Sequence, residues 1–230
     1  MILKLKWRLA FALIALFTSS YAQTKPDISK YPVHAQYKNA NKPILVFLTG
    51  DGGWNSFSID LANELNRLGF PVISLDTRKY FWSQKTPAQF GADMSVIMNH
   101  YLDAWKKDNF CVVGYSFGAE VAAFLPNHLT DPIADKLKSL ILLSPGYSNS
   151  FEVRFINMIA TRNTNKDKYK VYPELLKVKV PVLCIFGAEE TTDFSQELKD
   201  INKIRKITIP GSHHYQDDLK AVAGSVIKGV

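Results

Sequence analysis

The chain has 230 residues, of which 47% are hydrophobic and 12% aromatic, and its formal net charge at pH 7 is +7. This length and apolar content suffice for one sizeable core, which excludes a disordered chain and fits a single α/β domain. The lysines are scattered and no nucleic-acid reader motif accompanies them, so the positive charge favours attraction to anionic membranes or substrates over nucleic-acid binding.

The first 22 residues have the pattern of a secretory signal peptide. Three basic residues precede the apolar run 9–17, and small residues follow at the spacing of a cleavage site, with the cut expected after Ala22. A membrane anchor is the alternative, but nine apolar residues fall well short of the roughly 20 that span a bilayer. We therefore expect a mature domain of residues 23–230, exported to a bacterial periplasm and not membrane-spanning. Cleavage removes three of the 28 basic residues and none of the 21 acidic ones, which leaves a net charge of +4.

Apolar runs alternate with helical stretches through the rest of the chain, the pattern of a mostly parallel sheet with helices on both faces. The segment 31–38 is an ambiguous candidate for an edge strand. Thr86 is the expected N-cap of a long helix that has Pro87 at its first position. Six core strands are predicted over residues 43–49, 71–76, 109–115, 139–144, 181–186 and 204–210, and helices over 56–68, 87–107, 117–129 and 216–228.

The two cysteines raise the question of a disulfide, because exported proteins often contain one. Cys111 and Cys184 each lie inside a predicted core strand, and the strand 139–144 is expected between these two. Two strand spacings are roughly 9.6 Å, which is too far for a disulfide. We therefore expect two buried thiols that form no bridge.

The stretch GYSFGAE, residues 114–120, places Ser116 between two glycines at the end of a predicted core strand. In an open parallel sheet, ligand sites form at the carboxyl ends of the strands. A tight strand-to-helix turn would display the serine there, and Gly114 and Gly118 would avoid collisions with the neighbouring strand and helix. An ordinary turn with an exposed serine is the alternative.

A histidine and several acids follow later strands, in the order nucleophile, acid, histidine that is typical of the α/β-hydrolase fold. The stretch PGSHHY offers His213 and His214, and we favour His213 because the aromatic residue two positions later can anchor the loop. Glu190 is the favoured acid, with Asp193 and the weaker Glu189 as alternatives. This set predicts a serine hydrolase that acts through an acyl-enzyme and needs no metal or cofactor.

An oxyanion hole would complete this chemistry. The backbone N–H of Phe117, at the start of the helix after the serine, is the first expected donor. The glycine-rich loop LTGDGGWNS should supply the second, from the N–H of Asp51 or else of Gly52. The Asp51 carboxylate would oppose a developing negative charge, unless it serves a cationic part of the substrate or is turned away.

Four stretches together resemble the VirJ family of bacterial virulence proteins and the related catalytic domain of AcvB: LTGDGGW, RKYFWSQKTP, GYSFGAEVAAFLPNHL and PGSHHY. The resemblance spans roughly residues 43–217, and Ser116 and His213 match the nucleophile and base of the family. The acid is less clear, because this chain reads GAEETTDFS where the family is rich in acids. In length the sequence is more like VirJ, so we expect no counterpart of the extra N-terminal domain of the longer AcvB-type proteins.

The resemblance implies an exported α/β-hydrolase domain. For AcvB-like members it also implies cleavage of the aminoacyl ester, typically lysyl, of phosphatidylglycerol at the membrane surface. A general periplasmic carboxylesterase or thioesterase is one alternative. VirJ-like proteins are also linked to the secretion of virulence factors, so a non-catalytic secretion accessory with envelope partners is another.

A lysylated phospholipid presents an ester, an ammonium group, a phosphate and acyl chains. Asp51 could receive the ammonium group, Arg78 with Lys79 or Lys85 the phosphate, and aromatic side chains could form an apolar rim. The alternative for the aromatic residues of 78–85 is packing against the sheet. The segment 145–178 is a candidate cap over the site, or else a solvated excursion. The predicted substrate-binding residues are Asp51, Gly52, Trp54, Arg78, Tyr80, Trp82 and Tyr115.

Overall fold

The computed structural model describes residues 26–153, 167–190, 194–195, 198 and 203–230. The predicted signal peptide, the alternative acid Asp193 and the middle of the predicted cap, 154–166, lie outside the described residues. Among the helices that the structure describes, none is long and apolar enough to cross a membrane.

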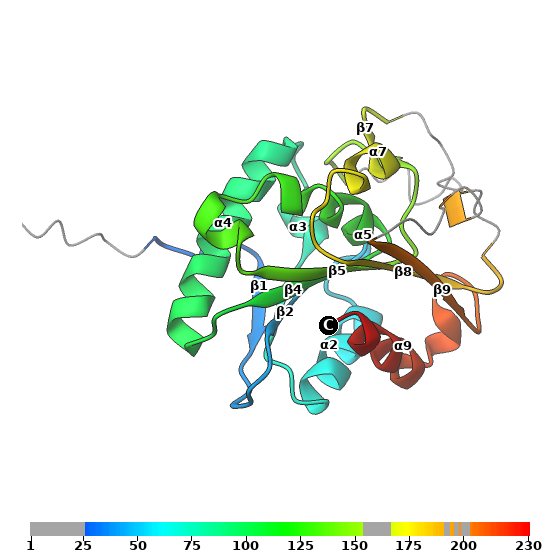
Figure 1. The fold of residues 1–230 in the computed structure, drawn as a ribbon, viewed down its shortest axis with the longest axis horizontal. Coiled ribbons are helices and arrows are strands. Elements are labelled where there is room, and N and C mark those ends of the chain that lie inside the picture. The colour runs from blue at the N-terminus through cyan, green and yellow to red at the C-terminus, as the bar shows by residue number, and fades with distance from the viewer. Residues whose placement is uncertain (1–25, 154–166, 191–193, 196–197, 199–202) are drawn as a thin grey trace, which may run out of the picture.

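A seven-stranded sheet forms the centre of the molecule, with the strand order β1-β3-β2-β4-β5-β8-β9 (Figure 1). Six of its strands are parallel, as the sequence predicts, and the edge strand β1 runs antiparallel to β3. The two-residue strands β6 and β7 pair separately. The strands are β1 (Val33–Gln36), β2 (Ile44–Leu48), β3 (Val72–Leu75), β4 (Phe110–Tyr115), β5 (Leu137–Leu143), β6 (Ser148–Asn149), β7 (Tyr169–Lys170), β8 (Val182–Gly187) and β9 (Ile204–Ile209).

Helices cover both faces of the sheet. Figure 1 shows α2 and α9 on one face and α3, α4 and α5 on the other. The helices are α2 (Ser56–Arg67), α3 (Thr77–Tyr80), α4 (Pro87–Trp105), α5 (Phe117–Ala122), α6 (Asp131–Ala134), α7 (Val171–Leu175) and α9 (Leu219–Val226), with 3₁₀ turns η1 (Leu125–Asn127), η3 (Tyr215–Asp217) and η4 (Ile227–Gly229).

Each face of the sheet has its own hydrophobic core, because successive side chains of a strand point to opposite faces. Val46 and Leu48 of β2 belong to the core under α4 and α5. Leu45 and Phe47 belong to the core under α2 and α9. All four are fully buried, which explains why the central strands appear in the sequence as unbroken apolar runs rather than as alternating patterns.

The predicted start of α4 is confirmed. The Thr86 side chain accepts a hydrogen bond from the Gln89 N–H, and the Gln89 side chain accepts one from the Thr86 N–H, so the two residues form a capping box. Two other helices differ from prediction. The helix after the serine ends at Ala122 rather than near residue 129, and the 3₁₀ turn that follows contains Pro126, which cannot continue an α-helix. The last helix begins after Asp218, whose side chain accepts from the Ala221 N–H.

The cysteine prediction is also confirmed. Cys111 in β4 and Cys184 in β8 are fully buried, and neither forms a disulfide. The strand β5 lies between β4 and β8 in the sheet, so the two thiols cannot approach each other.

Candidate active site

Ser116 lies at the carboxyl end of β4, on the turn that leads into α5. Its backbone has φ 53° and ψ −119°, a strained conformation for a residue with a side chain. A Cβ on Gly118 would come within 2.2 Å of the carbonyl oxygens of Leu48 and Thr49, and one on Gly114 within 2.5 Å of the Gly118 carbonyl oxygen. The two glycines therefore allow the turn to pack against β2 and α5, as the sequence predicts.

The structure brings Ser116, His213 and Glu190 together from three different strand ends. His213 Nε2 lies 2.9 Å from Ser116 Oγ, and His213 Nδ1 lies 3.3 Å from Glu190 Oε2. The His213 side chain is 42% exposed, whereas that of Glu190 is 4% exposed. A partly open imidazole between a hydroxyl and a buried carboxylate is the arrangement of a serine-hydrolase triad.

The carboxyl group of Glu190 is held in its ionised form. Burial raises its pKa, but hydrogen bonds from His213, Ser144 and the Gly187 N–H, together with the nearby His213 charge, outweigh burial and lower the pKa below its ordinary value. A carboxylate ionised at neutral pH can fix the imidazole tautomer and stabilise an imidazolium.

Two tyrosines hold the loop that carries His213, residues 210–214, which we call the histidine loop. Tyr215 is 1% exposed and packs into the core, as expected for the aromatic residue two positions after His213. The Tyr115 hydroxyl donates to the His213 carbonyl oxygen at 3.2 Å and lies 3.2 Å from His214 Nδ1. His214 is exposed and turned toward Tyr115, so the imidazole that reaches Ser116 is that of His213.

The glycine-rich loop after β2 runs beside the serine. A Cβ on Gly50 would lie 3.6 Å from Ser116 Cβ. The Gly50 carbonyl oxygen accepts from the Gly53 N–H at 2.9 Å and from the Thr77 hydroxyl at 2.7 Å, which fixes a turn with Asp51 at its tip. The half-buried Asp51 is therefore close to the nucleophile, and the assignment of its N–H and that of Phe117 to an oxyanion hole stays a prediction.

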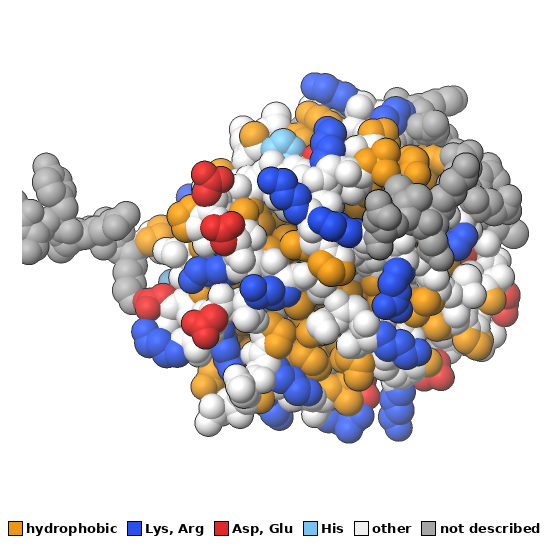
Figure 2. Space-filling view, viewed as in Figure 1, with side chains coloured by type: hydrophobic (Ala, Val, Ile, Leu, Met, Phe, Trp, Pro, Cys, Tyr) orange, Lys and Arg blue, Asp and Glu red, His pale blue; other side chains and the backbone are white. Residues whose placement is uncertain are grey.

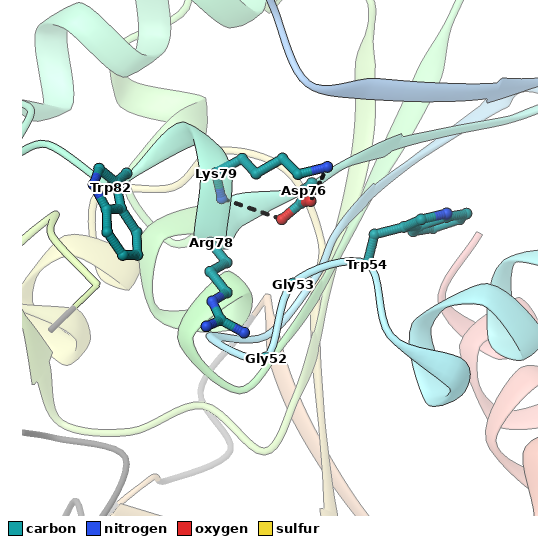
Figure 3. A pocket seen from close by; sticks show the side chains of 7 residues that line it. All are labelled: Gly52, Gly53, Trp54, Asp76, Arg78, Lys79 and Trp82. Atoms are coloured by element: carbon teal, nitrogen blue, oxygen red, sulfur yellow. Dashed lines mark hydrogen bonds and ion pairs between the residues drawn. The ribbon is translucent and has the colours of Figure 1, made fainter. Parts of the chain in front are cut away.

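A pocket of about 490 Å³ opens next to this loop, at the carboxyl ends of β2 and β3 (Figure 3). In Figure 3, the Arg78 side chain extends toward Gly52, whereas Lys79 turns to Asp76. Trp54 stacks on His34, with ring centroids 4.3 Å apart and an interplanar angle of 7°. Four of the predicted substrate-binding residues line this pocket. Its lining consists of Gly52, Gly53, Trp54, Asp76, Arg78, Lys79 and Trp82.

Two predicted substrate contacts are corrected by the structure. Tyr80 is 6% exposed, its hydroxyl donates to Asp93 Oδ2 at 2.6 Å, and its ring packs against Phe81 and Phe90 in the core. Tyr115 is 5% exposed and supports the histidine loop instead of facing a ligand. Both side chains belong to the interior, and for Tyr80 this is the alternative that the sequence leaves open for the aromatic residues of 78–85. Trp82 of the same run is 58% exposed.

Sequence reasoning missed Ser144. This residue follows the last residue of β5, and its hydroxyl lies 2.5 Å from Glu190 Oε1 and 2.5 Å from the Tyr215 hydroxyl. The only available signal was its position just past a core strand, at the carboxyl edge of the sheet where ligand sites form. Glu189, the weaker candidate acid, is exposed and accepts from the Gln216 side chain at 3.2 Å.

Comparisons with known proteins agree with this architecture. The family model described as bacterial virulence protein (VirJ) matches residues 42–230. No curated protein matches the chain.

Three similar solved structures are informative about the fold. Est1E from Butyrivibrio proteoclasticus is 17% identical, with a TM-score of 0.57 over 85% of this chain and 90% of that one. XC6422 from Xanthomonas campestris, described as an α/β serine hydrolase without lid, is 18% identical, with a TM-score of 0.57 over 86% and 87%. A hydrolase from Pseudomonas aeruginosa is 17% identical, with a TM-score of 0.59 over 85% and 92%. At these identities the likeness shows the fold alone, which is the α/β-hydrolase fold.

Proposed function

The chain belongs to the VirJ family of bacterial virulence proteins, and we propose that it is a serine hydrolase that cleaves a carboxylic ester through an acyl-enzyme. The observation that carries this proposal is the 2.9 Å contact between Ser116 Oγ and His213 Nε2, with the buried Glu190 carboxylate on the other imidazole nitrogen. Ser116 is also held in a strained backbone conformation, and such strain is a common property of displayed nucleophiles.

In this mechanism, Ser116 Oγ attacks the ester carbonyl carbon while His213 takes the hydroxyl proton. The N–H groups of Phe117 and of Asp51, or else of Gly52, would stabilise the resulting oxyanion. The intermediate collapses to an acyl-enzyme, and His213 returns the proton to the departing alcohol. Water then attacks the acyl group by the same route, which releases the acid and restores Ser116.

The substrate that we propose is the aminoacyl ester, most specifically the lysyl ester, of phosphatidylglycerol. The pocket next to the glycine-rich loop supports this choice, because Arg78 can receive a phosphate and the exposed Trp82 can face apolar chains. Asp51, in the same loop, can receive an ammonium group. We further propose that the mature protein acts in the periplasm at the anionic membrane surface. Figure 2 shows Lys and Arg side chains spread over the face in view rather than gathered in one patch. Their positive charge would favour binding to an anionic membrane.

The direct test is an assay of the purified mature domain, residues 23–230, on vesicles that contain lysyl-phosphatidylglycerol or alanyl-phosphatidylglycerol. We expect release of the free amino acid, and we expect Ser116→Ala to lower kcat by about 10⁴–10⁶-fold because the acyl-enzyme cannot form. An unchanged melting temperature of the variant would show that the loss is chemical.

Other results would separate the alternatives. Hydrolysis of a short neutral ester without release from either lipid would indicate a general carboxylesterase or thioesterase and overturn the lipid assignment. No turnover of any ester, together with rescue of a deletion strain by Ser116→Ala, would instead indicate a non-catalytic secretion accessory. Accumulation of lysyl-phosphatidylglycerol in the deletion strain would support the lipid assignment in the cell.

A further inference from the structure

Ser144 occupies a backbone conformation that is unusual for serine. It has φ 48° immediately after β5, is 5% exposed, and is tied to the next strand by a hydrogen bond from its N–H to the Ile185 carbonyl oxygen at 2.8 Å. A non-glycine residue in this left-handed region is strained and persists where its surroundings require it. Glycine would adopt this conformation without the steric cost, so the serine side chain needs its own explanation.

The Ser144 hydroxyl contacts the acid behind the imidazole. It lies 2.5 Å from Glu190 Oε1, and the Gly187 N–H donates to the same oxygen at 2.6 Å. Two donors from the ends of β5 and β8 therefore fix Oε1. This arrangement leaves the other carboxylate oxygen, Oε2, to face His213 Nδ1.

Counting protons gives the direction of the hydrogen bonds. The Tyr215 hydroxyl lies 2.5 Å from Ser144 Oγ and 3.0 Å from the Ile185 carbonyl oxygen. Ionised Glu190 has no proton to give, so Ser144 must donate its single proton to Glu190. The contact between the two hydroxyls is then a hydrogen bond only if Tyr215 donates to Ser144. The Ile185 carbonyl oxygen can only accept, so the single Tyr215 proton is shared between this oxygen and Ser144 Oγ, and Tyr215 links Ser144 to β8.

We propose that Ser144 and Tyr215 are positioning residues that hold the Glu190 carboxylate in the orientation that His213 requires. This inference rests on the proposed serine-hydrolase function, because it assigns both residues to that same triad. Neither hydroxyl touches the substrate, so their removal acts on kcat and leaves KM largely unchanged. The described titratable groups that face Glu190 are His213 on the histidine loop, Tyr215 just after it and Tyr115 at the end of β4.

The test compares Ser144→Gly and Tyr215→Phe with the wild-type mature domain, with a short neutral chromogenic ester as the substrate. Glycine keeps the left-handed backbone without strain and removes only the hydroxyl. Because a hydrogen bond to a charged group is worth about 1.5–3 kcal/mol, we expect kcat of Ser144→Gly to fall about 10–100-fold with KM within about twofold of wild type. Tyr215→Phe should cause a smaller loss of kcat in the same direction. Ser139→Ala, which alters another buried serine near the start of β5, is the matched control and should keep wild-type kcat.

The Glu190 pKa distinguishes positioning from a general structural role. Ser144 is one of the donors that lower this pKa, so the Glu190 pKa, followed by carboxyl NMR, should rise in Ser144→Gly. A variant with wild-type kcat and an unchanged Glu190 pKa would overturn the inference.

A second readout does not depend on turnover. A carboxyl group whose pKa is lowered by folding stabilises the protein above the pKa it has when unfolded, and this contribution is lost as the pH falls through the folded value. The gap in melting temperature between wild type and Ser144→Gly should therefore be widest near neutral pH and narrow below the ordinary Glu value of 4.5. A melting-temperature difference that stays constant with pH would overturn the inference, whether or not the protein hydrolyses the ester. Absence of wild-type turnover with a narrowing gap would instead overturn the proposed function and leave the carboxylate-holding network intact.

Discussion

Arg78 and Lys79 are adjacent cations that line one pocket, but their side chains point in different directions. The Lys79 ammonium group pairs with the buried Asp76 carboxylate at 3.4 Å, and its side chain is 68% exposed. The Arg78 side chain extends toward Gly52, in the loop that runs beside Ser116 (Figure 3). A guanidinium can hold two phosphate oxygens at once, so Arg78 is better suited than Lys79 to orient an anionic ester near the nucleophile.

We therefore expect Arg78→Gln to impair hydrolysis of the anionic substrate and to leave hydrolysis of a neutral ester unchanged. The variant should lower kcat/KM for lysyl-phosphatidylglycerol by about tenfold or more, since one charge-assisted hydrogen bond to phosphate is lost. A short neutral ester should be hydrolysed at the wild-type rate, because the triad is untouched. Lys79→Gln removes the same charge from the same pocket and should have a smaller effect. Equal losses on the lipid and the neutral ester would contradict a role for Arg78 in phosphate recognition.

The sequence predicts individual site residues unequally, for physical reasons. Ser116 and His213 were identifiable because a displayed nucleophile needs flanking glycines and because the order of the triad follows the order of the strands. The choice of Glu190 could not be made from spacing alone, since several acids share a short loop. Tyr80 was misassigned because an aromatic residue suits a substrate rim and a core equally well in sequence. Ser144 was missed because its role depends on a contact with a residue 46 positions away.

At the level of elements, the core strands were predictable and the helix ends were less so. Fully buried parallel strands appear as continuous apolar runs, and β2 and β4 each fall within their predicted ranges, whereas β8 continues one residue further, to Gly187. Helix ends depend on single residues that override periodicity. Pro126 lies in the turn that follows α5, and Asp218 caps α9 later than its apolar pattern suggests.

The close packing of α5 on β2 leads to a prediction for Gly118. A Cβ at this position would meet two backbone carbonyl oxygens, which cannot move aside as a flexible side chain would. Gly118→Ala should therefore lower the free energy of unfolding by about 1–3 kcal/mol or more and reduce activity by displacing Ser116. Gly224→Ala in α9 is the matched control, because a Cβ there has nothing within 4 Å and should stabilise the helix by about 0.5–1 kcal/mol. Denaturant unfolding of both variants would check this, and a Gly118→Ala protein as stable as wild type would contradict the packing.

At the scale of the whole molecule, the site depends on the register of four adjacent strands. Ser116 follows β4, Ser144 follows β5, Glu190 follows β8 and His213 follows β9, and these strands are neighbours in that order. The parallel registers align their carboxyl ends at one edge. A hydrogen-bonded path therefore crosses the sheet from the nucleophile through His213 and Glu190 to Ser144 and Tyr215. A shift of any one of these strands would separate groups that must lie within about 3 Å of one another.

The reactivity of the two thiols measures how rarely the central strands of this sheet become exposed to solvent. Cys111 and Cys184 lie in β4 and β8, on either side of β5, and burial raises the pKa of the Cys111 thiol, so little reactive thiolate forms. A thiol reagent should label neither cysteine in the native protein, and should label both in concentrated guanidinium chloride without prior reduction. Slow native labelling should follow the rate of global unfolding, because central strands open only with the whole core. Cys184→Ser would assign the two reactions. Rapid labelling of either thiol without denaturant would contradict the burial of β4 and β8. Thiols that react only after reduction would contradict the position of β5 between the two cysteines.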